Sequence, residues 1–129
     1  MPKKNQFEIE FPLHASSSFL LHYISSPDGL SEWFADNVNS RGELFTFFWD
    51  GSEEQAKQKI INKDLKVQYR WLEDEDDSED YYFEFKIIVD ELTNDVSLIV
   101  SDFAEDDDMD EAKMFWENQI DNLKHKIGA

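Results

Sequence analysis

The longest regular pattern of apolar positions lies at the C-terminal end of the chain, over residues 108–128. Apolar residues recur there every three or four positions, as on the buried face of an amphipathic helix. They are Met109, Ala112, Phe115, Trp116, Ile120, Leu123 and Ile127, with one amide, Gln119, among them. Asp108 and Glu111 have the spacing of a capping box, and Gly128 follows a basic last turn at 124–126. The pattern predicts one long helix.

The first third of the chain predicts a strand followed by two short helices. Residues 7–13 alternate between apolar and polar types, which is the period of a strand with one buried face. Pro12 either puts this strand at a sheet edge or ends it, because proline cannot donate a backbone hydrogen bond. Serines at 16–18 offer N-caps to a helix that we expect to reach Ile24. Ser26 and Pro27 can begin a second helix, which we expect to end near residues 36 and 37.

The middle of the chain predicts a run of strands, at 44–49, 55–62, 65–72, 81–89 and 96–103, separated by short turns or acidic segments. Residues 81–89 carry apolar side chains at odd positions, so one face of that strand is buried. Residues 44–49 are apolar at nearly every position, so either both faces are covered or one faces a partner. The composition of 55–62 also suits a helix. We predict an α+β fold in which a strongly curved antiparallel sheet packs around the long helix.

Composition limits the classes of partner. The length of 129 residues predicts a single domain over 1–129. Lys and Arg number 12 against 30 Asp and Glu, so a net charge of −18 opposes binding to nucleic acid or to anionic membranes. Because the chain has no cysteine and no segment typical of a signal peptide or a spanning helix, we expect a cytoplasmic protein.

Two acidic runs, at 73–80 and 105–111, are the most biased segments. They can bind a cation or a basic partner, but neither contains the glycine of a calcium loop. A solvated hairpin tip explains the first run, and solubility with helix-dipole complementarity explains most of the second. His14, His22 and His125 fall in separate elements, so no metal site is expected. No nucleophile elbow, phosphate loop or dinucleotide motif is present, and no cofactor is expected.

The aromatic residues either line a ligand cavity or fill a solid core. Gln119 costs about 1 to 3 kcal/mol if buried without a partner, so it should meet a protein group, a water or a ligand. Arg70 points inward, as an anchor for a carboxylate ligand, if its strand turns Trp71 outward. With the opposite orientation of the strand, Arg70 is an ordinary surface cation.

Three segments carry a resemblance to a known family. They are Ser-Pro-Asp-Gly-Leu-Ser-Glu-Trp-Phe at 26–34, Tyr69-Arg70-Trp71, and Phe115-Trp116 followed by Ile120 and Leu123. Together with the order of elements, they resemble the START-like, helix-grip superfamily, in the branch similar to the activator of the ninety-kilodalton heat-shock chaperone ATPase. The resemblance implies a cavity between sheet and helix that many relatives use for lipids or other apolar molecules. The acidic run at 73–80 and the crowded aromatics at 45–49 depart from the family pattern.

Two functional hypotheses follow, from different classes. The first is a non-catalytic module that binds an apolar or amphipathic small molecule in such a cavity. Its candidate lining residues are Trp33, Phe34, Phe47, Tyr69, Arg70, Trp71, Phe83, Phe85, Trp116, Gln119 and Leu123. The alternative is a protein-interaction module resembling a co-chaperone, which acts through its acidic surface and the aromatic strand at 45–49. An enzyme of the cyclase or aromatase type ranks below both hypotheses. Separately, an exposed aromatic strand could be the edge through which two copies of the chain form a dimer.

Overall fold

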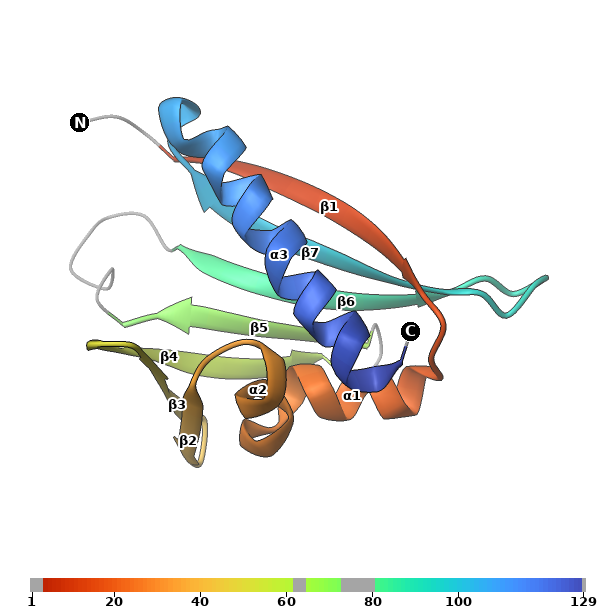
Figure 1. Ribbon diagram of the computed structural model, residues 1–129, viewed down its shortest axis with the longest axis horizontal. Coiled ribbons are helices and arrows are strands. Elements are labelled where there is room, and N and C mark those ends of the chain that lie inside the picture. The colour runs from red at the N-terminus through yellow and green to blue at the C-terminus, as the bar shows by residue number, and fades with distance from the viewer. Residues whose placement is uncertain (1–3, 62–64, 73–80, 129) are drawn as a thin grey trace.

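The computed structural model describes residues 4–61, 65–72 and 81–128, and within them one antiparallel sheet of seven strands carries three helices on one face (Figure 1). The strands are β1 (Asn5–Leu13), β2 (Asn37–Arg41), β3 (Leu44–Trp49), β4 (Ser52–Ile61), β5 (Lys66–Trp71), β6 (Tyr82–Val89) and β7 (Val96–Ala104), in the spatial order β1-β7-β6-β5-β4-β3-β2. The helices are α1 (Ser17–Ser25), α2 (Pro27–Trp33) and α3 (Met109–Ile127). We call the face covered by the helices the inner face and the opposite one the outer face.

The predicted helix-grip arrangement is confirmed. The long helix α3 crosses the sheet diagonally, and α1 and α2 lie beside its C-terminal half (Figure 1). The strand β1 pairs only with β7, so of the two alternatives for Pro12 the sheet edge is the one observed. Residues 55–61 of the ambiguous segment lie in β4. In β3 the inner face is clear, because Phe45 and Phe47 are buried while Thr46 and Phe48 are only partly so.

The sequence analysis missed β2 and extended α2 too far. The helix α2 ends at Trp33, and residues 37–41 form a strand that pairs with β3. Only Val38 of this strand is buried. A polar edge strand of this kind depends on backbone hydrogen bonds to its neighbour, so its side chains show no apolar alternation.

The predicted caps form at the two short helices. The Ser16 hydroxyl accepts a hydrogen bond from the amide of Phe19, and the Ser26 hydroxyl accepts one from the amide of Gly29. Pro27 occupies the first turn of α2, as expected. A Cβ atom at Gly29 would collide with the carbonyl oxygen of His22, so only glycine allows α1 and α2 to approach this closely.

The end of α1 is tied to three other elements. Its last carbonyl groups have no partner within the helix and need donors from elsewhere. Trp33 Nε1 of α2 donates to the Tyr23 carbonyl at 2.8 Å, and the Tyr69 hydroxyl of β5 donates to the Ile24 carbonyl at 2.6 Å. The Gln58 amide of β4 donates to the Ser25 carbonyl at 2.6 Å. These bonds fix the end of α1 against α2 and the sheet.

The long helix differs from its prediction at two points. The Asp108 side chain makes no capping bond, so the capping box with Glu111 is wrong. Residues Asp106–Asp108 form a short 3-10 turn, η2, which gives Asp108 a helical backbone in place of the extended one that an N-cap needs. Phe115 is 44% exposed and lies at the flank of the buried stripe. Gly128 ends the helix in the left-handed region at φ 73°, as predicted.

The predicted hairpin tip at 73–80 lies outside the described residues, as does residue 62 at the end of the predicted strand 55–62.

Candidate functional site between the sheet and the long helix

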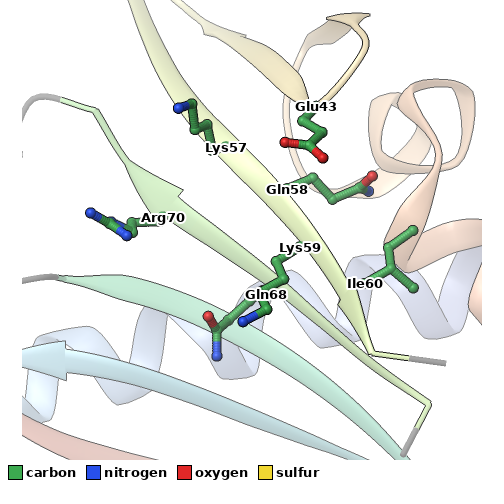
Figure 2. Close-up of a pocket in the computed structure, with 7 residues that line it drawn as sticks. All are labelled: Glu43, Lys57, Gln58, Lys59, Ile60, Gln68 and Arg70. Carbon is green, nitrogen blue, oxygen red and sulfur yellow. The ribbon is translucent and has the colours of Figure 1, made fainter. Parts of the chain in front are cut away.

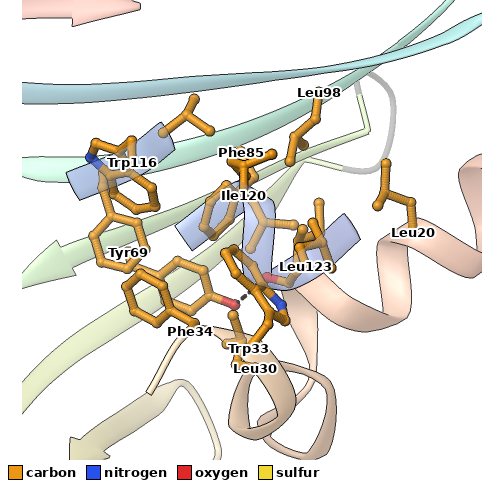
Figure 3. Packing of buried hydrophobic residues seen from close by; sticks show 14 of the residues in the cluster. Leu20, Leu30, Trp33, Phe34, Tyr69, Phe85, Leu98, Trp116, Ile120 and Leu123 are labelled. Carbon is orange, nitrogen blue, oxygen red and sulfur yellow. Dashed lines mark hydrogen bonds between the residues drawn. The ribbon is translucent and has the colours of Figure 1, made fainter. Parts of the chain in front are cut away.

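The space between the helices and the sheet contains aromatic rings in direct contact, centred on Phe34 (Figure 3). The Phe34 ring stacks on Trp116 of α3, with centroids 5.6 Å apart and planes inclined by 17°. On its other sides it meets Trp33, Phe47, Trp49, Phe83 and Phe85, at centroid distances between 5.3 and 6.3 Å. Such spacings are those of packed aromatic pairs, so these side chains pack directly against one another as in a solid core.

The structure brings together ten of the eleven sequence-predicted residues on the inner face. Trp33, Phe34, Phe47, Tyr69, Phe83, Phe85, Trp116, Gln119 and Leu123 are buried there, and Trp71 is partly buried with its ring 5.1 Å from Phe83. Arg70 is the exception, and of its two predicted orientations the one that makes it a surface cation is observed. Since Tyr69 and Trp71 both face inward, the two-residue period of the strand turns Arg70 to the outer face, where it is exposed.

The polar break in the α3 stripe has a structural partner. The Gln119 side chain donates from Nε2 to the carbonyl oxygen of Phe34 at 2.7 Å, and its Oε1 accepts from Asn122 at 3.3 Å. Trp49 Nε1 of β3 donates to the same Phe34 carbonyl at 3.1 Å. The buried amide therefore joins the end of α2 to α3. Of the partners that the sequence analysis allowed for Gln119, a group of the protein itself is the one observed.

The sequence analysis missed Asp102, the one carboxylate that β7 places on the inner face. It accepts hydrogen bonds from Trp116 Nε1 at 2.9 Å and from the Phe103 amide at 2.7 Å. Burial raises the pKa of Asp102 above its ordinary value of 3.8, although both hydrogen bonds and the charge of Lys4 act in the opposite direction. The signal was present in the sequence, because Asp102 takes the next inward position after Val96, Leu98 and Val100.

The hydroxyl group of Tyr69 is held in place by hydrogen bonds within the protein. Its side chain is fully buried, and burial raises its pKa far above the ordinary value of 10.0, so the hydroxyl stays protonated and donates to the Ile24 carbonyl. It also lies 3.0 Å from Gln58 Nε2. A proton held this firmly is unsuited to acid–base chemistry at neutral pH.

Within the described ranges, no three His, Asp or Glu side chains gather as metal ligands would. Likewise, none of the helices described is long and apolar enough to cross a membrane.

A family model described as a START-like superfamily domain matches residues 1–129. The chain belongs to the START-like superfamily. Among solved structures, this START-like protein is similar to BfR322 of Bacteroides fragilis, at 34% identity over 98% of this chain and 93% of that one, with a TM-score of 0.68. A comparison with curated proteins found no match.

More distant START-like structures share the fold at low identity. The Aha1 dimer from Colwellia psychrerythraea is 17% identical over 93% of each chain, with a TM-score of 0.76. DynU16, a protein of the dynemicin biosynthetic locus, is 12% identical over 96% of this chain and 47% of that one, also with a TM-score of 0.76. These two likenesses concern architecture alone.

The Phe34 carbonyl accepts from two side chains, and we predict that removing both donors has a non-additive effect on the free energy of unfolding. Gln119→Leu and Trp49→Phe should each cost about 1 kcal/mol, because each leaves the carbonyl with the other donor. The double variant removes both donors and should cost about 1 kcal/mol more than the sum. Urea denaturation followed by tryptophan fluorescence measures all four free energies of unfolding. Simple additivity would mean that another donor or water satisfies this carbonyl.

The Asp102 carboxyl predicts a pH dependence of stability. Because its pKa is raised in the folded state, the folded protein binds the proton more tightly than the unfolded chain, and stability falls as pH rises from the ordinary carboxyl pKa through the raised one. Asp102→Asn cannot titrate. The stability of this variant relative to the wild type should therefore increase across that window and level off above it. Urea denaturation between pH about 4 and about 7 measures the difference, and a difference that is constant with pH contradicts the assignment.

Proposed function

We propose that this START-like protein is a non-catalytic protein-interaction module, and that the outward surface of α3 binds a partner with a basic surface and an apolar pocket. The observation that carries the proposal is the exposure of Met114 and Phe115 within an acidic helix surface. Met114 is 61% exposed and Phe115 is 44% exposed. Two adjacent large apolar side chains at the surface are more typical of a contact site than of a solvated helix face.

The charges around this pair favour a basic partner. We define the α3 outer surface as Asp110, Glu111, Met114, Phe115, Glu117 and Asp121, all of which are exposed. Lys113 is also exposed, three residues after Asp110 and four before Glu117, so this surface carries four carboxylates and one cation. Complementary charges increase the rate at which partners meet, and an apolar centre within a charged rim is the usual composition of a contact region.

The packing of the interior favours the interaction proposal over a ligand bound between the sheet and the helices. The rings around Phe34 contact one another, and Gln119 bonds to the protein itself. A ligand seated there would have to displace side chains that are already packed, at the cost of core contacts. The sequence resemblance to a chaperone-activator branch agrees with a role in protein contact. The Colwellia relative is a dimer, so a second copy is one class of partner to examine.

A second candidate is the binding of an apolar or amphipathic small molecule between sheet and helix. Asp102 favours it, because a partly buried carboxylate beside Trp116 would anchor a ligand that carries a hydrogen-bond donor or a cation. The relative from the dynemicin biosynthetic locus is consistent with a role close to small molecules.

The interaction proposal predicts loss of partner capture when the apolar pair is removed. Met114→Ser with Phe115→Ser should abolish salt-sensitive capture of a partner from a lysate of the source organism, while thermal unfolding changes little because both side chains are exposed. Leu92→Ser is the matched control, since Leu92 is 95% exposed in the turn after β6. Equal capture by the wild type and the double variant, or no specific capture at low salt, would count against the proposal.

The small-molecule candidate predicts a saturable change in tryptophan fluorescence. A panel of fatty acids, aromatic acids and aromatic amines should include a compound that quenches Trp116, and the same species should appear by native mass spectrometry of gently purified protein. Asp102→Asn should weaken the binding of a cationic compound by about tenfold, since one charge-assisted hydrogen bond is lost. A panel with no saturable member rejects this candidate.

A further inference from the structure

The outer face of the sheet concentrates positive charge in a chain whose net charge is −18. Ala56, Val67 and Phe85 are buried on the inner face, so the positions that alternate with them in β4, β5 and β6 point outward. Among the described outward positions from residue 57 onward, five cations face one carboxylate, Glu84. We define the basic face by these cations, Lys57, Lys59, Lys66, Arg70 and Lys86.

Glu84 offsets part of this charge. It lies directly opposite Gln68, whose side chain donates to Glu84 Oε1 at 2.9 Å. Lys66 and Arg70 are its diagonal neighbours on β5, within reach of long side chains. Arg70 already has an interaction within the chain. The charge left for a partner is therefore mainly that of Lys57 and Lys59, which are exposed and lie on β4, two strands away from Glu84.

A groove of about 600 Å³ lies beside these two lysines (Figure 2). It forms where β4 continues past the beginning of β3, because the pairing of the two strands stops at Leu44 opposite Lys57. Ile60 is 46% exposed there, and the methylene groups of the two lysines add apolar surface below their charges. The residues that line the groove are Glu43, Lys57, Gln58, Lys59, Ile60, Gln68 and Arg70.

We propose that the partner of the α3 outer surface is a second copy of this chain, which presents its basic face and the adjoining groove. This inference rests on the function proposed above and names the partner which that function requires. Met114 and Phe115 of one copy enter the groove of the next copy, and the carboxylates around them meet Lys57 and Lys59. The α3 outer surface needs a basic surface with an apolar recess, and the outer face of the same chain combines the two.

The two surfaces match in size as well as in sign of charge. Asp110 and Asp121, the outermost carboxylates of the α3 outer surface, lie about 17 Å apart along the helix at about 1.5 Å per residue. The basic face extends about 14 Å along the strands and about 10 Å across them, from the usual spacings of residues and strands in a sheet. A contact of this size is small, so we expect weak binding that depends on its charges and its apolar centre.

The proposed contact is head-to-tail. Because α3 covers the inner face of the sheet, its exposed side and the outer face point in opposite directions (Figure 1). One copy cannot use both surfaces on the same neighbour, so the contact leads to an open series of copies. The net charge of −18 on each copy opposes this growth. At physiological salt the Debye length is about 8 Å, so that repulsion is reduced while charges in contact still attract.

Sedimentation equilibrium of the full chain tests the proposal. For a dissociation constant of about 1 mM, the weight-average mass at about 1 mM protein and about 0.15 M salt should be about twice that of one copy. Association should weaken at about 0.01 M salt, where the Debye length is about 30 Å and the net charges repel over a longer distance. It should also weaken at about 1 M salt, where the charges in contact are screened.

Two double variants separate the two surfaces. Met114→Ser with Phe115→Ser removes the apolar centre on α3, and Lys57→Ser with Lys59→Ser removes the two cations beside the groove. All four side chains are exposed, so the midpoint of urea denaturation should change little. Neither variant should associate with itself. An equimolar mixture should form a complex of one copy of each and nothing larger, because each variant keeps the surface that the other lacks.

Gln6→Glu with Ser40→Asp is the control for net charge. It makes the chain more negative by the same amount as the lysine variant, at exposed positions on the outer strands β1 and β2, and should associate like the wild type.

Three results would overturn the proposal. They are a wild-type chain that stays a monomer, equal loss of association in the control and in the lysine variant, and a mixture of the two double variants that forms no complex. Association that is lost without Met114 and Phe115 but persists without Lys57 and Lys59 also contradicts it. That last result would leave the α3 outer surface as a contact site with its partner surface elsewhere, and a monomeric wild type leaves the test of partner capture intact.

Discussion

The carbonyl oxygen of Phe34 is held by two side chains from distant parts of the chain, Gln119 of α3 and Trp49 of β3. The ring of the same residue stacks on Trp116. A short helix that ends inside an aromatic core leaves carbonyl groups that water cannot reach, and each costs about 1 to 3 kcal/mol without a donor. The position of α2 therefore depends on these donors. The stacked rings around Phe34 in turn depend on the position of α2.

The last carbonyl groups of α1 also lack partners within their own helix, and they too receive donors from other elements. They accept from Trp33, Tyr69 and Gln58, which come from three other elements. Helices of nine and seven residues are marginal by themselves in water, so these long-range bonds and the buried apolar side chains must supply their stability. The polar groups that the interior contains are thus largely used to hold helix ends. This use explains why Gln119 and Tyr69, attractive as ligand contacts in the sequence, have protein partners.

The sequence predicted those features that repeat along one element and missed those that depend on a neighbour. The stripe of α3 and the alternation of β6 are local patterns, and both were placed correctly. The strand β2 has one buried residue and exists because β3 offers it backbone partners, so its own residues carry little signal. The direction of Arg70 depended on which face of β5 met the helices. Asp102 could have been found, since it interrupts an apolar alternation, but its partner Trp116 is a tertiary contact.

The two outer edges of the sheet also bear on how this protein behaves at high concentration. An open sheet can grow by adding strands from other molecules, which leads to aggregation. On β1, Pro12 lacks an amide hydrogen, and Glu8 and Glu10 place charges beside it. On β2 the exposed residues are polar or basic over only five positions. Self-association by extension of the sheet is therefore opposed at both outer edges.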